Sequence, residues 1–209
     1  MEIKGFSVGE SIKFGWNKMK EHFWFFVGFI LLASISLIIP FGISAYFDAH
    51  QYPLLRILFL VIYFILALVV NMGFIKASLA VKDQNKAKIS NLYSCFPLFF
   101  KFLIAHILYM LIIAAGLILL VFPAVIWATR YGFYGYLIVD QKLGPIKALK
   151  MSAKITMGVK WDLFALYAVL YIIGVIGVLC LGIGMFATVP LTILATAWVY
   201  RNLQSVKAL

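Results

Sequence analysis

Long apolar runs alternate with short, lysine-rich stretches along this chain. A membrane-spanning helix needs about 20 mostly apolar residues, and six segments meet that requirement. The third and fourth segments are contiguous, and one straight helix over both would far exceed the thickness of a bilayer. We therefore expect a turn at Pro123. The predicted spans are about 23–39, 57–75, 102–121, 122–139, 163–181 and 183–199.

The stretches before the first, third and fifth spans are amphipathic. Apolar residues recur there at spacings of three and four, as on one face of a helix, and lysines occupy another face. This pattern predicts helices that lie in the membrane interface, with lysines toward the lipid head groups. Their expected ranges are 7–22, about 88–100 and about 145–159. We expect a single membrane domain over 1–209. Each amphipathic stretch precedes two spans, and this order is compatible with three copies of one unit.

The distribution of positive charge predicts the orientation. With six spans, all of the 18 lysines and arginines except Arg56 and Arg130 fall on one side of the membrane. Basic residues concentrate on the cytoplasmic side of membrane proteins. We therefore expect a multi-pass protein of the cytoplasmic membrane with both termini in the cytoplasm.

Composition agrees with this class and excludes others. The 209 residues are 65% hydrophobic, 17% aromatic and 12% charged, with a net charge of +11. Soluble domains are about 45–50% apolar and about 25% charged. Disorder is excluded by the hydrophobicity, and a disulfide scaffold by the presence of only two cysteines.

Arg130 is the sharpest candidate for chemistry, because a charged side chain near the middle of a span is costly. Three aromatic residues share its predicted helix face: Trp127, Tyr131 and Tyr134. Such a set could bind an anion or a lipid phosphate through hydroxyl and cation–π contacts. The alternative is a structural arginine, held by the tyrosines or extended along a tilted helix toward the interface.

The amphipathic stretches predict contact with anionic lipid. The residues expected to make it are Lys13, Trp16, Lys20, Lys147, Lys150 and Lys154. General anchoring by positive charge on the inner side is the alternative. Nucleic acid is not expected as a partner, because the charge is spread over three short segments.

Other polar residues fit structural roles. Asn71 and His106 could hydrogen-bond between spans. Asp140 and Asp162 are expected at the inner membrane edge, paired with arginine or lysine, or, for Asp162, capping the fifth span. The sequence contains no catalytic signature and no metal or cofactor motif, so we expect no enzyme activity, catalytic residue, metal or cofactor.

The segment from Phe122-Pro123-Ala124 to Asp140, followed by Ala148-Leu149-Lys150-Met151-Ser152 and Gly158, resembles a group of prokaryotic six-span membrane proteins. The group includes uncharacterised YciC-like proteins and the membrane domain of glycerophosphoryl diester phosphodiesterase. Gly182, Gly184, Pro190 and Tyr200 match its final pattern. The resemblance implies a prokaryotic membrane architecture, and no activity, because catalysis in the phosphodiesterases belongs to a separate soluble domain.

Taken together, these features favour a non-catalytic membrane protein that organises lipids or partner proteins, such as another membrane protein or a second copy of this chain. The alternative is a small transporter or channel for an anionic or lipid-like substrate that uses Arg130.

Overall fold

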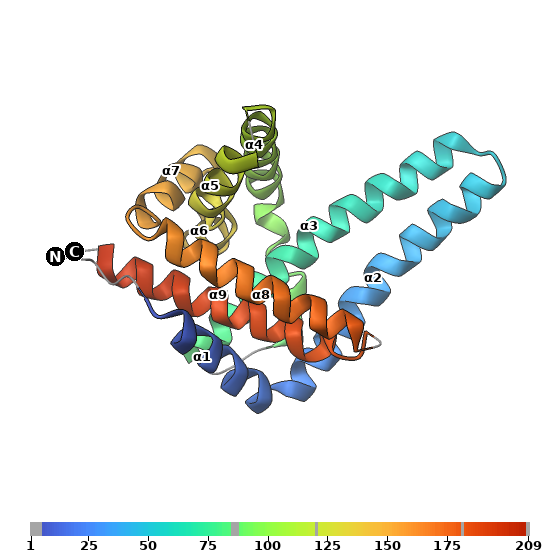
Figure 1. Ribbon diagram of the computed structural model, residues 1–209. Coiled ribbons are helices and arrows are strands. Elements are labelled where there is room, and N and C mark those ends of the chain that lie inside the picture. The colour runs from blue at the N-terminus through green and yellow to red at the C-terminus, as the bar shows by residue number, and fades with distance from the viewer. Residues whose placement is uncertain (1–5, 85–87, 120, 181, 208–209) are drawn as a thin grey trace.

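The computed structural model describes residues 6–84, 88–119, 121–180 and 182–207 (Figure 1). Every regular element among these residues is a helix. The α-helices are α1 (Val8–Glu21), α2 (Phe23–Ala49), α3 (Pro53–Gln84), α4 (Phe99–Leu119), α5 (Val121–Tyr131), α6 (Tyr134–Gln141), α7 (Pro145–Ile155), α8 (Lys160–Leu179) and α9 (Met185–Lys207). Two short 3₁₀ helices, η1 (Ile89–Leu92) and η2 (Phe96–Leu98), precede α4.

Four stretches of the described chain are long and apolar enough to cross a membrane: Phe23–Ala49, Pro53–Asp83, Ile89–Leu119 and Lys160–Leu179. The predicted class, an all-helical membrane protein, is confirmed at this level. The predicted spans 122–139 and 183–199 are not among the four. In the second of these, Pro190 and three threonines interrupt the apolar sequence of α9.

The prediction of one continuous helix over 122–139 is wrong, because the helix ends at Tyr131 and a new one begins at Tyr134. Two side chains, one in α7 and one at its C-cap, form hydrogen bonds with the backbone groups at the break. The hydroxyls of Ser152 and Thr156 each donate to the Arg130 carbonyl at 3.0 Å, and the Phe133 amide donates to Ser152 Oγ at 3.1 Å. Inserted side-chain partners of this kind are a known cause of helix breaks.

The break places α6 at the centre of the protein. Every residue from Phe133 to Val139 is buried. These side chains belong to the main core, which also includes residues of α3, α4, α7, α8 and α9. The second half of the predicted fourth span is thus covered by other parts of the protein.

The predicted amphipathic helix at about 88–100 is also corrected, because η1 and η2 occupy that region. Gly73 of α3 packs so closely on η1 that a Cβ there would lie 2.7 Å from the Leu92 Cα. Pro97 and the Ser94 hydroxyl, which donates to the Asn91 carbonyl, also favour turns over a regular helix. The middle unit of the expected repeat therefore differs from the other two, which begin with α1 and α7.

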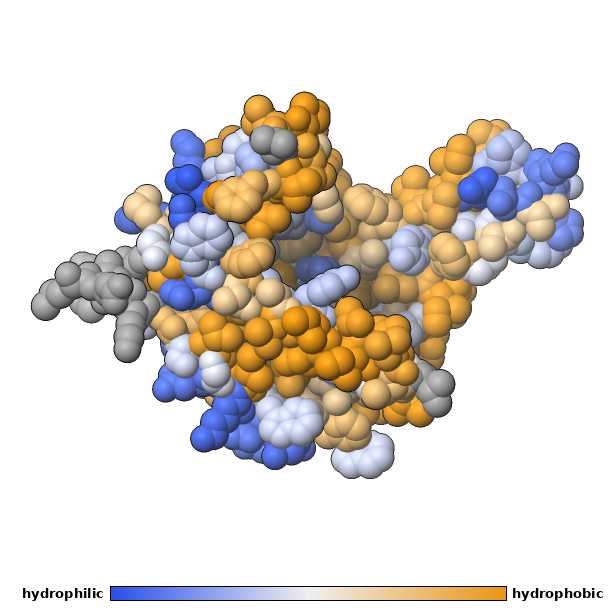
Figure 2. Space-filling model, in the orientation of Figure 1, coloured by the Kyte–Doolittle hydropathy of each residue, from blue (hydrophilic) through white to orange (hydrophobic). Residues whose placement is uncertain are grey.

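α2 and α3 form a long hairpin that projects from the other helices (Figure 1). Pro40 lies inside α2, which continues to Ala49. Gln51 takes a positive φ of 59° in the turn, and Arg56 pairs with Asp48 at 2.5 Å beside it. Figure 2 shows polar residues gathered at the tip of this hairpin and around α1, whereas hydrophobic residues cover α8 and the far end of α4.

α1 runs antiparallel to α9 (Figure 1). Phe14 contacts Trp198, with 6.5 Å between ring centroids, and Met19 shares a cluster with Phe26 and Leu194. Gly15 is buried against α9: a Cβ there would lie 2.7 Å from the Leu191 carbonyl oxygen. The apolar face of α1 therefore packs largely on α9, and α1 covers part of the predicted sixth span.

Because of this close approach, a side chain larger than that of Gly15 should destabilise the protein. We expect Gly15→Ala to lower the thermal unfolding midpoint in detergent, because an added methyl group in a packed interface costs about 1–3 kcal/mol. Gly9→Ala is the matched control, since the nearest atom to its Cβ is 3.9 Å away. Equal midpoints for the two variants would contradict the tight α1–α9 contact.

Candidate functional site

A groove of about 660 Å³ lies between α4, α5 and α7. Its walls are mostly apolar, with Leu108, Leu111 and Ile112 contributed by α4. Trp127 and Tyr131 contribute aromatic rings from α5, and α7 contributes one cation, Lys150. A mostly apolar groove with a small number of polar groups at its wall is typical of small-molecule sites.

Arg130 does not line this groove but lies next to it. Its side chain is exposed, and the guanidinium carbon is 5.9 Å from the ring centroid of Tyr131. That ring lines the groove, so Arg130 and the groove share one aromatic side chain. The backbone carbonyl of Arg130, rather than its guanidinium, makes the hydrogen bonds to α7. The Arg130 guanidinium therefore lies outside the protein core.

Tyr134 is separated from the rest of the predicted set by the helix break. It is buried, and its hydroxyl lies 2.7 Å from His106 Nδ1 on α4. Its ring also packs on Tyr109, with 5.1 Å between centroids. The structure thus brings Trp127 and Tyr131 to the groove and directs Tyr134 into the core. The expected interhelical hydrogen bond of His106 is present.

The predicted lipid-contacting residues lie in two places. α7 carries Lys147, Lys150 and Lys154, all exposed, as expected for the basic face of that helix. On α1, Lys13 and Lys20 are exposed, and Lys20 Nζ lies 5.7 Å from the centroid of the Trp16 ring. Of these six residues, Lys150 lines the α4–α5–α7 groove. Lys154 lines a smaller cavity of about 350 Å³ beside the C-terminal part of α9.

An ion-pair cluster at the end of α9 joins three distant segments. Arg201 donates two hydrogen bonds to Asp140, at 2.7 and 2.8 Å, and also pairs with Asp83 of α3. The Tyr200 hydroxyl donates to Asp140 at 2.9 Å, and Gln204 bonds both Tyr200 and Arg201. Burial lowers the pKa of Arg201, but the bonds and charges of Asp83 and Asp140 outweigh it and hold that pKa above its ordinary value.

The sequence indicated only part of this cluster. Asp140 was expected to pair with a basic residue at the membrane edge, but neither Arg201 nor Asp83 was singled out. They are 118 positions apart, so only the fold brings them together.

The other polar candidates lie at the protein surface. Asn71 is exposed on α3, and Asp162 is exposed in the first turn of α8, without a capping hydrogen bond at Val159. Within the described ranges, no three acidic, histidine or cysteine side chains form a metal-binding group.

No family model, curated protein or solved structure matches this chain. The resemblance to six-span prokaryotic membrane proteins therefore stays a prediction.

The Arg201–Asp140 ion pair should contribute more to the stability of the protein than the Arg56–Asp48 pair. The side chains of Asp140 and Arg201 are 18% and 25% exposed, against 55% and 49% for Asp48 and Arg56. Hydrogen bonds to charged groups contribute about 1.5–3 kcal/mol, whereas exposed pairs contribute about 0–1 kcal/mol. We expect Asp140→Asn to lower the thermal unfolding midpoint in detergent clearly, and Asp48→Asn to leave it nearly unchanged. Similar midpoints would mean that the cluster does not hold the helices together.

Proposed function

We propose that this protein is a non-catalytic protein of the prokaryotic cytoplasmic membrane that binds an anionic phospholipid in the α4–α5–α7 groove. The observation that carries the proposal is the position of Lys150 in the wall of an otherwise apolar and aromatic groove. An acyl chain would lie along Leu108, Leu111 and Ile112, and the phosphate would lie at the Lys150 ammonium.

The charges around the groove support an anionic ligand. Arg130 lies next to the groove, with its guanidinium carbon 5.9 Å from the centroid of the Tyr131 ring that lines it. Among the described residues, the ion pairs are those of Lys18, Arg56 and Arg201, so no carboxylate neutralises Lys150 or Arg130. A phosphate between these cations would gain charge-assisted hydrogen bonds.

The Arg201 cluster supports the proposed orientation. Asp83, Asp140 and Arg201 follow the predicted second, fourth and sixth spans, whose ends are all expected on the cytoplasmic side. Their direct pairing supports that topology, in which the three residues share one side of the membrane. We therefore propose that six segments enter the membrane, that both termini are cytoplasmic, and that α7 lies near the inner leaflet. Organisation of lipids or of a partner membrane protein at that leaflet would follow.

The proposal predicts a specific role for one lysine. A basic residue near an anionic surface contributes about 1 kcal/mol, equivalent to roughly fivefold in affinity. We expect Lys150→Gln to reduce the retention of phosphatidylglycerol by roughly that factor or more. Native mass spectrometry of the whole protein, incubated with phosphatidylglycerol or phosphatidylcholine in equal amounts, measures the retained lipid.

Lys147→Gln is the matched control, because it removes the same charge from the same helix outside the groove. It should leave retention of phosphatidylglycerol nearly unchanged. Equal losses in the two variants would indicate diffuse attraction by the basic helix. No preference of the unaltered protein for phosphatidylglycerol would overturn the proposed function.

A second candidate function is transport of an anionic or lipid-like substrate. The helix break at Gly132 and Phe133, beside Arg130, supports it, because discontinuous helices line the substrate sites of many transporters. In liposomes, movement of fluorescent phosphatidylglycerol between leaflets is measured by its quenching with dithionite. If the protein transports lipid, Arg130→Leu should abolish the movement.

The same variant should fold normally, because the Arg130 side chain is exposed and its backbone carbonyl makes the structural bonds. An unchanged unfolding midpoint for Arg130→Leu is therefore expected. A marked fall would instead assign the guanidinium a structural role. Absence of lipid movement in the unaltered protein would exclude this second function.

A further inference from the structure

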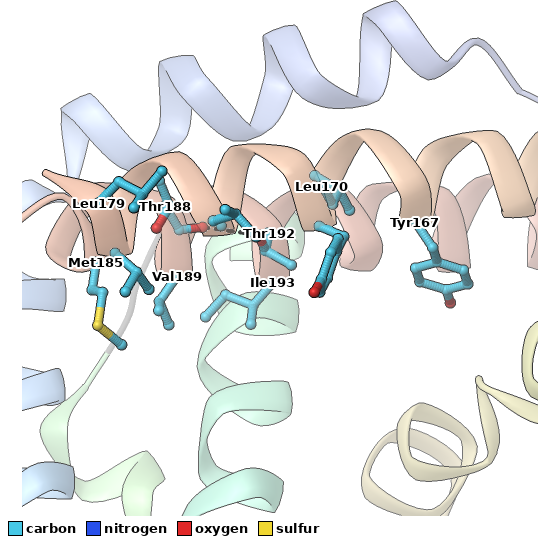
Figure 3. A pocket seen from close by; sticks show the side chains of 12 residues that line it. Tyr167, Leu170, Leu179, Met185, Thr188, Val189, Thr192 and Ile193 are labelled. Carbon is cyan, nitrogen blue, oxygen red and sulfur yellow. Dashed lines mark hydrogen bonds between the residues drawn. The ribbon is translucent and has the colours of Figure 1, made fainter. Parts of the chain in front are cut away.

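A second groove, of about 610 Å³, runs along α8 and α9 (Figure 3). Its walls are apolar side chains of both helices, together with Thr188 and Thr192. Not one of the twelve lining residues is charged. The groove begins near the α8–α9 turn, at Leu179 and Met185, and ends at Tyr167 (Figure 3). Its volume lies within the range of about 300–1,000 Å³ that is typical of small-molecule sites.

A hydroxyl group lies at the Tyr167 end. The Tyr167 hydroxyl lies against the helix break, 3.4 Å from where a Cβ of Gly132 would be. This end of the groove is therefore polar but uncharged.

The Tyr167 hydroxyl makes no hydrogen bond to any described residue. No buried side-chain nitrogen or oxygen among the described residues lacks a partner, so this hydroxyl is accessible at the end of the groove. If acyl chains alone filled the groove, the hydroxyl would be left unpaired in apolar surroundings, which costs free energy. A ligand with hydrogen-bonding groups at this end of the groove would remove that cost.

The lack of charge selects the class of ligand. A phosphate in this groove would lose its hydration without gaining a cation, whereas carbonyl and hydroxyl groups would gain tyrosine hydrogen bonds. We propose that the groove binds an uncharged single-chain lipid of the monoacylglycerol class. The acyl chain lies along α8 and α9, and the ester and glycerol oxygens meet the Tyr167 hydroxyl. This site is independent of the α4–α5–α7 groove and of the function proposed for it.

Photo-crosslinking tests the proposal with two matched probes. One is a monoacylglycerol with a diazirine in its acyl chain, and the other is the lysophosphatidate with the same chain and an added phosphate. With the whole protein in detergent, we expect the uncharged probe to label peptides of α8 and α9 in preference to the lysophosphatidate. Equal labelling of these peptides by the two probes would overturn the proposal.

Filling the groove provides a second test. Gly174 lines it, and a Cβ there would meet no atom within 4 Å, so Gly174→Phe places a ring in the groove without a clash at Cβ. Gly28→Phe on α2 is the control, since its Cβ also meets nothing within 4 Å. Labelling of α8 and α9 by monoacylglycerol should fall to background in the first variant and persist in the second. Persistence in both would overturn the proposal.

Removing one hydroxyl tests the position of the head group. Tyr167→Phe keeps the ring and should abolish the preference for the monoacylglycerol over an alkane diazirine of equal length. Labelling by the alkane should persist, which shows that the variant is folded and the groove open. Tyr52→Phe, on the exposed hairpin, should change neither. An unchanged preference in Tyr167→Phe would overturn the assigned head-group contact.

Discussion

The pairing of Arg201 with two aspartates is the interaction on which the arrangement of the helices depends. Its guanidinium bonds Asp83 from α3 and Asp140 from α6, while Arg201 itself belongs to α9. One side chain therefore sets the relative positions of three helices that are distant in sequence. A planar guanidinium suits this task, because it presents several donors in fixed directions. Tyr200 and Gln204 complete the cluster and limit the ways in which these ends can separate.

The helix break after Tyr131 is the second constraint, and it divides one apolar run into two environments. Before the break, Trp127 and Tyr131 face a groove that α7 closes with Lys150. After the break, Phe133 to Val139 are buried in the core. The hydroxyls of Ser152 and Thr156 satisfy the Arg130 carbonyl at this point, so the break costs fewer lost hydrogen bonds than an unsupported interruption would.

The two grooves offer different chemistry on either side of this break. The α4–α5–α7 groove carries a cation in an apolar wall, and the α8–α9 groove ends at the uncharged Tyr167 hydroxyl. Charged groups are rare and costly within a membrane, so under the two proposals Lys150 would give the grooves opposite preferences. The protein would then distinguish lipids by head group while offering similar apolar surfaces to their chains.

The class of this protein could be predicted from the sequence, because apolar runs of sufficient length have few stable alternatives in lipid. The ranges of α1, α7 and α8 follow directly from local pattern, and so does the exposure of the lysines on α7. The break at Gly132 and Phe133, the antiparallel contact of α1 with α9 through Gly15, and the pairing of Arg201 with Asp83 were decided only by the tertiary structure. Each depends on a group supplied by another part of the chain, and hydrophobic periodicity carries no information about such partners. For the same reason, the local pattern did not predict that the fold leaves Arg130 exposed beside the groove that Lys150 lines.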